Sequence, residues 1–246
     1  DEKLRTDSLT ICGGGNAGNT ATCLSRLGVK LKLLTKIGND LNGERILRDF
    51  QHDENIDTTL ILIRSSTISS FTYVIVDTRS ETRTCLNSAT NEQISINDLN
   101  SHWLDEIKFI HFDSRSTEAA VHLAKLAKTK SIVCSLDLER ERAYLNELIP
   151  LMNYIITTEN YSRHVCNDSL PIYTAIRFLS TCQFVIITRG KNGSMLIEKF
   201  NQETYSPVKN LIHHGSIVTQ DILHINEEKF IVWNCTAWPI ESEDII

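Results

Sequence analysis

Glycine is concentrated in one short part of this chain, and that concentration limits the possible folds more than any other feature. Seven of the ten glycines lie between residues 13 and 43 of the 246-residue sequence. Glycine is needed where the backbone takes a positive φ or approaches another group closely. The run Gly13-Gly14-Gly15-Asn16-Ala17-Gly18-Asn19 leads into apolar residues at helical spacing, which end at Gly28. We predict a glycine loop that opens a helix, with the free N–H groups and positive dipole end of the helix facing a ligand.

Two kinds of ligand fit such a loop. Gly13, Gly15 and Gly18 match the G-x-G-x-x-G dinucleotide fingerprint, and Asp40 follows about 20 residues later, as that fingerprint requires. Alternatively, Asn16 and Asn19 supply paired amide donors and acceptors, which suit the hydroxyls of a polyol better than a pyrophosphate. A tight loop without a ligand is a third interpretation, and the loop alone leaves all three open.

Short apolar runs alternate with amphipathic helical patterns over most of the remaining chain. In order, these expected strands and helices are 108–112, 116–128, 132–136, 143–148, 153–157, 170–179 and 184–188. Apolar runs between amphipathic helices indicate parallel strands that are buried on both faces. We therefore predict an α/β fold, a three-layer sandwich with a mainly parallel central sheet, in a single domain over residues 1–246.

Two segments depart from this alternation. Residues 58–88 contain strand-like runs and turn signals without a helical pattern, which predicts a small β-sheet excursion such as a lid or a dimer patch. From about residue 201 to 228 the pattern loosens, which indicates a surface insertion. His213 and His214 in this segment are adjacent rather than four residues apart, so we expect no metal site there.

Composition narrows the classes of partner. The chain carries 25 Lys and Arg against 31 Asp and Glu, a net charge of −6, which argues against a broad nucleic-acid-binding surface. No apolar run reaches the roughly 18 residues of a membrane span, and the first residues lack a secretory pattern. Seven scattered cysteines without a C-x-x-C pair are expected to be reduced and mostly buried. We expect a cytoplasmic protein, although an upstream organellar transit segment would be invisible.

The segment Gly14-Gly15-Asn16-Ala17-Gly18-Asn19, followed by Gly38-Asn39-Asp40-Leu41-Asn42-Gly43, resembles the N-terminal signature of PfkB-type, ribokinase-like sugar kinases. The helix-free excursion falls where that family places its β-lid. Residues 110–115 and 135–140 are most similar to the ketohexokinase and fructokinase branch. The resemblance covers roughly residues 1–200 and 229–246. It implies ATP-dependent phosphorylation of a sugar hydroxyl, as in fructose or another ketohexose, with Mg²⁺, and it is compatible with a homodimer through the lid.

The resemblance also implies roles for individual residues. The sugar would be held by Gly14, Gly15, Asn16 and Asn19. Arg115 would lie near the phosphates, Thr188 and Gly190 would border the nucleotide, and Arg83 of the lid would help to exclude water. Glu159 and Asn160 stand where the family carries an N-x-x-E pair with different spacing, so we assign no metal ligand there. The family's sugar-binding first-strand aspartate has no match unless Asp1 or Asp7 replaces it.

The family's catalytic base belongs to a D-T-x-G-A-G-D segment, which we expect beyond Ile246. We therefore expect a fragment, truncated at both ends, without useful activity of its own, because phosphoryl transfer depends on positioning and charge neutralisation and one lost backbone donor already costs ~10²–10³ in rate. The alternatives are a non-catalytic sugar- or partner-binding paralogue, and an NAD-type dinucleotide-binding oxidoreductase that uses Gly13 to Gly18.

Three further features are expected to be structural. His111 lies in an apolar run and is interpreted as a core histidine with a satisfied ring. The run Glu139-Arg140-Glu141-Arg142 is interpreted as a solvated turn, and Trp233 and Trp238 as packing residues.

Overall fold

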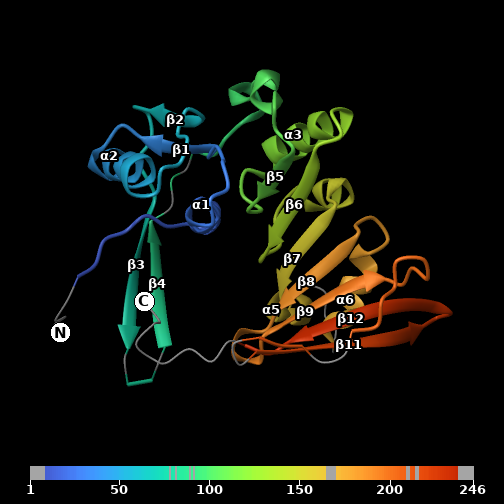
Figure 1. Cartoon of the computed structure of the whole chain (residues 1–246). Coiled ribbons are helices and arrows are strands. Elements are labelled where there is room, and N and C mark those ends of the chain that lie inside the picture. Colours follow the sequence, from blue (N-terminus) through green and yellow to red (C-terminus); the bar gives the residue numbers. More distant parts are fainter. Residues whose placement is uncertain are drawn as a thin grey trace. The chain divides into compact units, whose positions relative to one another are not determined.

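The structure is a computed structural model that describes residues 9–77, 79–80, 82–88, 90, 92–164, 170–208, 211–213 and 216–237 (Figure 1). The chain divides into two compact units, Asp1–Ile94 and Ser95–Ile246, each of which is described by itself. Several residues that the sequence analysis singled out lie outside the described ones, namely Asp1, Asp7, His214, Trp238 and Ile246, and so does one of the seven cysteines, Cys166.

The first unit has two helices, a short parallel sheet and a hairpin. Its elements are α1 (Asn16–Arg26), β1 (Thr35–Gly38), α2 (Leu41–Arg48), β2 (Ile61–Arg64), β3 (Phe71–Asp77) and β4 (Thr82–Ser88). β1 pairs in parallel with β2, and α2 continues into one π turn at Asp49–Asp53. A small apolar core joins these elements, formed by Ala21, Leu33, Ile37, Phe50, Ile56 and Ile61.

The hairpin of β3 and β4 is antiparallel, and every residue of both strands is exposed. Figure 1 shows it projecting away from the helices of the first unit. Its base is fixed by polar contacts. Ser66 Oγ donates to Glu92 at 3.0 Å, and Lys36 Nζ donates to Glu92 at 3.2 Å and to the Gln93 carbonyl at 2.8 Å. The base of this hairpin is therefore anchored, whereas its two strands lack a covering layer among the described residues.

The second unit is built on one eight-stranded sheet, in the order β10-β11-β12-β9-β8-β7-β6-β5. β5 to β8 are parallel neighbours, and the remaining strands are antiparallel. The strands are β5 (Phe109–Phe112), β6 (Val133–Leu138), β7 (Tyr154–Thr158), β8 (Phe184–Thr188), β9 (Ser194–Lys199), β10 (Leu211–His213), β11 (Ser216–Ile225) and β12 (Glu228–Cys235). The helices are α3 (Thr117–Thr129), α4 (Leu145–Leu148), α5 (Glu159–His164) and α6 (Pro171–Phe178).

The core of the second unit lies on the parallel strands. Leu136, Leu138, Ile155, Val185 and Ile187 are fully buried there. The small side chains of α3 at positions 119, 120, 124 and 127 are also buried, which lets this helix lie close to the sheet. β7 alternates between buried and half-buried residues, and β8 does the same up to Thr188, which is exposed, so burial on both faces, which the sequence analysis expected, is incomplete there.

β11 lies in a segment without a regular sequence pattern. It pairs with β12 over eight residues, from Val218 opposite Cys235 to Ile225 opposite Glu228. Most of its residues are half-buried or exposed, and therefore its polar and apolar residues do not alternate regularly. β12 lies between two antiparallel neighbours, because it pairs with β9 on one side and with β11 on the other.

The described cysteines differ in their burial. The six described cysteines are free, and burial raises the pKa of Cys134 and of Cys182 to about 11. Cys12, Cys23 and Cys85 are exposed, so the expectation of mostly buried thiols is wrong for these three.

Within the described part of the chain, no helix has the length and apolar character to cross a membrane.

Candidate active site

The glycine loop opens α1 as predicted. Gly15 is the N-cap residue of this helix, with φ at 82° and ψ at 155°, a region that essentially only glycine adopts. No side chain caps the helix among the described residues, and its first backbone bond runs from Asn19 N to Gly15 O at 2.8 Å. A Cβ placed on Gly14 or Gly15 would meet nothing within 4 Å. The start of α1 is therefore an open backbone surface at the positive end of a helix dipole.

The two candidate asparagines share this helix end. Asn16 is half-buried and Asn19 is exposed, and their spacing of three residues places them on neighbouring turns of one face. Gly18 lies between them in the sequence and is buried against the ring of Phe50. A Cβ on Gly18 would stand only 3.1 Å from Cζ of Phe50. Phe50 thus holds the inner side of α1 close to the core of the first unit, while Asn19 stays open to solvent.

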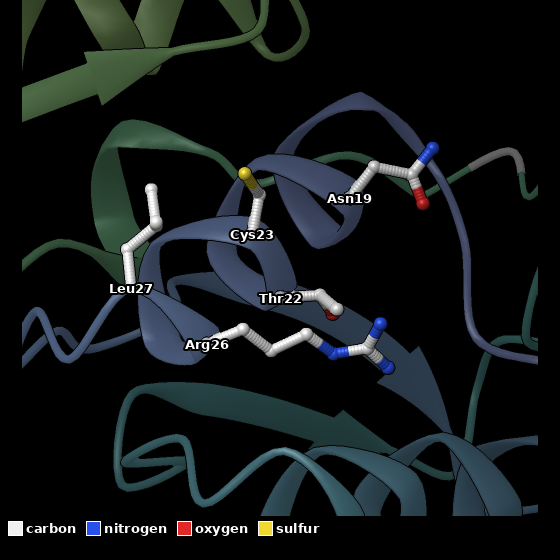
Figure 2. Close-up of a pocket in the computed structure, with 5 residues that line it drawn as sticks. All are labelled: Asn19, Thr22, Cys23, Arg26 and Leu27. Carbon is white, nitrogen blue, oxygen red and sulfur yellow. The ribbon is translucent and has the colours of Figure 1, made fainter. Parts of the chain in front are cut away.

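A hollow of about 390 Å³ follows the exposed side of the same helix. Figure 2 shows the five side chains that line it, Asn19, Thr22, Cys23, Arg26 and Leu27. Arg26 is engaged by Glu54, to which its Nε donates at 2.9 Å and its Nη2 donates as well, and this pair raises the pKa of Arg26. Of the five lining residues, Asn19 lies closest in sequence to the glycine loop.

Asp40, which the dinucleotide interpretation counted as the acidic residue of its fingerprint, has a structural role instead. It caps α2, since its Oδ1 accepts from Gly43 N and its Oδ2 accepts from Ser69 N, each at 2.8 Å. Ser69 Oγ in turn accepts from Gly38 N at 3.0 Å. Burial raises the pKa of Asp40, but the hydrogen bonds from Gly43 and Ser69 outweigh burial and hold this pKa below its ordinary value. Both carboxylate oxygens are thus used within the first unit.

The second unit gathers the other predicted residues at one edge of its sheet. Because β5 to β8 are parallel, the loops that follow their carboxyl ends meet at the same edge. Arg115 follows β5, Glu159 follows β7, and Thr188 and Gly190 lie at and just after the end of β8. The structure therefore brings the expected nucleotide residues Arg115, Thr188 and Gly190 to one edge of the sheet.

Arg115 lies between two residues with left-handed backbone. Ser114 has φ at 56° and Ser116 has φ at 45°, conformations that are uncommon for residues other than glycine. Arg115 N donates to Asp113 Oδ1 at 3.0 Å, while the Arg115 side chain is exposed. The 13-residue helix α3 begins directly afterwards at Thr117, again without a side-chain cap.

Thr188 and Gly190 form the corresponding part of the loop after β8. Thr188 Oγ1 donates to the Thr157 carbonyl at 3.3 Å, which links the ends of β7 and β8. Gly190 has φ at 54°, and a Cβ there would meet nothing within 4 Å. A bond of 2.8 Å from Arg189 N to Gly193 O closes the turn. This turn presents exposed backbone at the sheet edge.

A protein cage for a metal ion is absent from the described residues, where no group of three His, Cys, Asp or Glu side chains gathers. Glu159 pairs instead with Arg163 on the next turn of α5, at 2.7 Å. The described residues thus do not supply the multidentate carboxylate set of a dedicated metal site. They remain compatible with Mg²⁺ that is held mainly by phosphate groups and water.

Arg142 is a candidate that the sequence analysis missed, because the run from Glu139 to Arg142 alternates in charge like a solvated turn. Nε of Arg142 is buried and has no hydrogen-bond partner among the described residues. Burial, and then repulsion from Arg115 and Arg140, lowers the pKa of Arg142. The interpretation as a solvated turn is therefore wrong for this one residue, while Arg140 is exposed as expected.

The other residues that were interpreted as structural have internal partners. His111 Nδ1 lies 2.8 Å from Ser135 Oγ, and burial lowers the pKa of this histidine. Trp233 Nε1 donates to Glu198 Oε1 at 2.9 Å, next to a cavity of about 300 Å³ between β9, β11, β12 and residues 204–208.

With this geometry in place, the comparisons with known proteins decide the family. The family model described as pfkB family carbohydrate kinase matches residues 1–212. The chain belongs to the pfkB family of carbohydrate kinases. A ribose-1-phosphate kinase described as ATP-dependent, from Halopiger xanaduensis, is 26% identical over 206 residues, covering 82% of this chain and 65% of that protein. Mouse ketohexokinase is 23% identical over 212 residues, covering 81% and 68% respectively.

Solved structures of the family share the fold. An Escherichia coli protein assigned as a ribokinase II, in complex with ATP and Mg²⁺, has a TM-score of 0.65 at 18% identity and covers 86% of this pfkB chain and 75% of that one. The predicted ribokinase-like α/β fold is thereby confirmed. The chain spans 62% to 70% of the length of the first curated relatives that it matches. Relatives of different substrate class match at similar identity, so the comparisons do not single out the ketohexokinase and fructokinase branch.

Proposed function

We propose that this pfkB chain takes part in ATP-dependent phosphorylation of a sugar hydroxyl. The observation that carries the proposal is the uncapped, open start of α1 at Gly15, with Asn16 and Asn19 on the same helix end, in a chain whose first 212 residues match this family. The dinucleotide alternative loses support, because Asp40 is used to cap α2.

The sugar is assigned to Gly14, Gly15, Asn16 and Asn19. The open backbone at Gly14 and Gly15 allows close approach of a flat, hydroxyl-rich ligand, since no side chain stands within 4 Å of either Cβ position. The exposed amide of Asn19 offers two donors and one acceptor oxygen, which matches the mixed character of neighbouring hydroxyls, and Asn16 lies on the same helix end. We propose a ketohexose such as fructose as the substrate, and ribose and ribose 1-phosphate as the competing candidates.

The nucleotide is assigned to Arg115, Thr188 and Gly190. Arg115 carries an exposed guanidinium beside the start of α3, where a phosphate would meet positive charge and helix N–H groups. Gly190 exposes backbone that a flat base or ribose could approach. Mg²⁺ would accompany the phosphates and neutralise part of their charge. We assign no described residue as catalytic base, so ligand binding is the first measurement that tests the assignments.

Binding of sugar and nucleotide can be measured by saturation-transfer NMR and calorimetry on the 246-residue chain. We expect fructose to bind, and Asn19→Ala to weaken this binding by roughly tenfold, because one or two hydrogen bonds to the sugar are lost. Asn146→Ala serves as the matched control, since Asn146 is also an exposed asparagine on a helix. Equal sugar affinity in the wild type and in Asn19→Ala would contradict the sugar assignment.

Release of ADP in the presence of each sugar tests directly for kinase activity, against the expectation from the sequence that this chain has no useful activity of its own. Fructose, ribose and ribose 1-phosphate should be compared at equal concentration with ATP and Mg²⁺. ADP release that depends on one of these sugars supports the kinase and identifies its substrate. Saturable binding of NADH with no binding of ATP would support the oxidoreductase instead.

We also propose that the hairpin pairs with a second copy of the chain. One of its faces carries the exposed side chains of Phe71, Tyr73, Ile75 and Leu86, with Tyr73 opposite Leu86 in the register. Phe71 and Tyr73 pack edge to face, with ring centroids 5.2 Å apart. Two-stranded hairpins are marginally stable alone, so cover by another copy would stabilise these strands.

The prediction for the hairpin compares its two faces. Ile75→Lys should convert a dimer into a monomer in analytical ultracentrifugation, because it places a charge in the apolar face. Val76→Lys is the control, since Val76 is at least as exposed as Ile75 but points to the opposite face of the same strand. A monomeric wild type, or equal effects of both variants, would contradict the pairing through this face.

A further inference from the structure

The loops after β5 and β6 adjoin, and each brings an arginine to the sheet edge. Tyr144 Oη donates to Glu118 Oε1 at 3.4 Å, which ties the loop after β6 to the first turn of α3. Arg115 lies two residues before that helix, and Arg142 lies two residues before Tyr144. Because β5 and β6 are parallel neighbours, both arginines are held at the carboxyl ends of adjoining strands.

Arg142 is placed unfavourably for a protein without a ligand. Its Nε is buried without a hydrogen-bond partner among the described residues, which is unfavourable because the N–H has lost its water and gained no acceptor. Arg115 and Arg140 repel it, whereas Asp113 and Glu139 attract it, and neither carboxylate is a hydrogen-bond partner of Nε. A bound anion would satisfy the buried N–H and screen the repulsion between Arg142 and Arg115.

The backbone next to Arg115 points to the same kind of ligand. Ser114 and Ser116 both hold left-handed φ values, at 56° and 45°, which are strained for residues with a Cβ. These conformations place Arg115 directly before α3, whose first N–H groups have no side-chain cap among the described residues. Two mutually repelling arginines and one helix N-terminus therefore belong to adjoining loops, and each of them favours a negatively charged ligand.

We propose that Arg142, together with Arg115 and the N-terminus of α3, binds a phosphate group of the ligand. The inference rests on the proposed function, in which this phosphate belongs to ATP. A phosphorylated sugar presents the same phosphate oxygens, and the experiment separates the two sources. Guanidinium groups suit this task, because their planar donors meet two phosphate oxygens at once.

The test measures affinities of the 246-residue chain for tripolyphosphate, ATP, adenosine and ribose 1-phosphate by calorimetry. Arg142→Gln should weaken the binding of tripolyphosphate and ATP by roughly tenfold to a hundredfold, as expected for a charged hydrogen bond, and leave adenosine unchanged. Arg140→Gln is the matched control, because it removes the same charge two residues away from an exposed position, and it should weaken binding less than about threefold.

Thermal unfolding separates ligand binding from a purely structural role. Arg142→Gln should leave the unfolding temperature unchanged or raise it, because a desolvated and repelled charge is removed. A clear fall in that temperature would overturn the inference, since the loss of binding would then follow from damage to the fold. Arg142→Lys should restore only part of the affinity, because an ammonium lacks the planar pair of donors.

Each remaining outcome has a defined meaning. If the chain binds ATP and Arg142→Gln has no effect, or if both variants lose affinity equally, the inference fails while the proposed function stands. If ribose 1-phosphate alone binds and loses affinity in Arg142→Gln, the inference stands and the assignment of the nucleotide fails. If the wild type binds none of the phosphate compounds, both are overturned.

Discussion

The two glycine loops of the first unit each lead into a helix, but the helices begin in opposite ways. α2 is closed by the protein itself, because Asp40 accepts from Gly43 N and joins Ser69 to the same cap. α1 begins at Gly15 without a side-chain cap among the described residues and with open space around Gly14 and Gly15. The comparison teaches that similar glycine-rich sequences serve two purposes, close packing in one loop and ligand access in the other.

The largest effect is expected from Gly43→Ala. A Cβ on Gly43 would stand 2.1 Å from the carbonyl oxygen of Gly38, and neither backbone segment can move without breaking the contact between α2 and β1. We expect the free energy of unfolding to fall by at least about 3 kcal/mol, measured by urea denaturation. Gly14→Ala is the matched control in the other loop and should change stability by less than about 0.5 kcal/mol. Similar losses in both variants would remove the distinction between the loops.

A smaller loss of stability and a larger loss of binding are expected from Gly15→Ala. The backbone at Gly15 lies in a region that a residue with a Cβ avoids, so the change should cost about 1–3 kcal/mol in the free energy of unfolding. If the residue relaxes to relieve this strain, the start of α1 changes shape and the proposed sugar site is lost. Sugar binding by NMR, compared with Gly14→Ala, checks this result. Unchanged sugar affinity in Gly15→Ala would contradict the assigned role of the loop.

Local patterns predicted much of the fold, and contacts between distant residues account for what was missed. The helix after the glycine loop and the four parallel strands were predictable, because periodicity and glycine placement act over a few residues. Asp40 was counted as the acidic residue of a dinucleotide fingerprint. Its role as a cap was missed, because one of its partners, Ser69, lies 29 residues further along the chain. Arg142 was wrongly interpreted as solvated. Its burial and its repulsion from Arg115 arise only after β5 and β6 have paired, so the local sequence does not show them. The open start of α1 was predicted correctly because it depends on the loop alone.

The smallest effect concerns the cap of α2 and its dependence on pH. The pKa of Asp40 is lowered in the folded chain, so the stabilisation that it contributes is present above the ordinary aspartate pKa of about 3.9 and is lost as the pH falls through the lowered value. Asp40→Asn keeps the size of the side chain but removes its charge and one of the two acceptor oxygens that Gly43 N and Ser69 N use, and it should cost about 1 kcal/mol near neutral pH. Asp221→Asn, at an exposed position of β11, is the control.

Hydrogen exchange at the amides of Gly43 and Ser69 measures this cap directly, because both N–H groups donate to Asp40. After correction for intrinsic exchange rates, the difference in opening free energy between the wild type and Asp40→Asn should shrink as the pH falls below about 4. The amides at the start of α1 should show no such dependence, because no carboxylate caps them. If the two helix starts instead lose protection together on acidification, the cap of α2 is not what distinguishes them. In that case the missing carboxylate cap would not explain why the start of α1 is open. That start would be an ordinary frayed helix end rather than a site for a ligand.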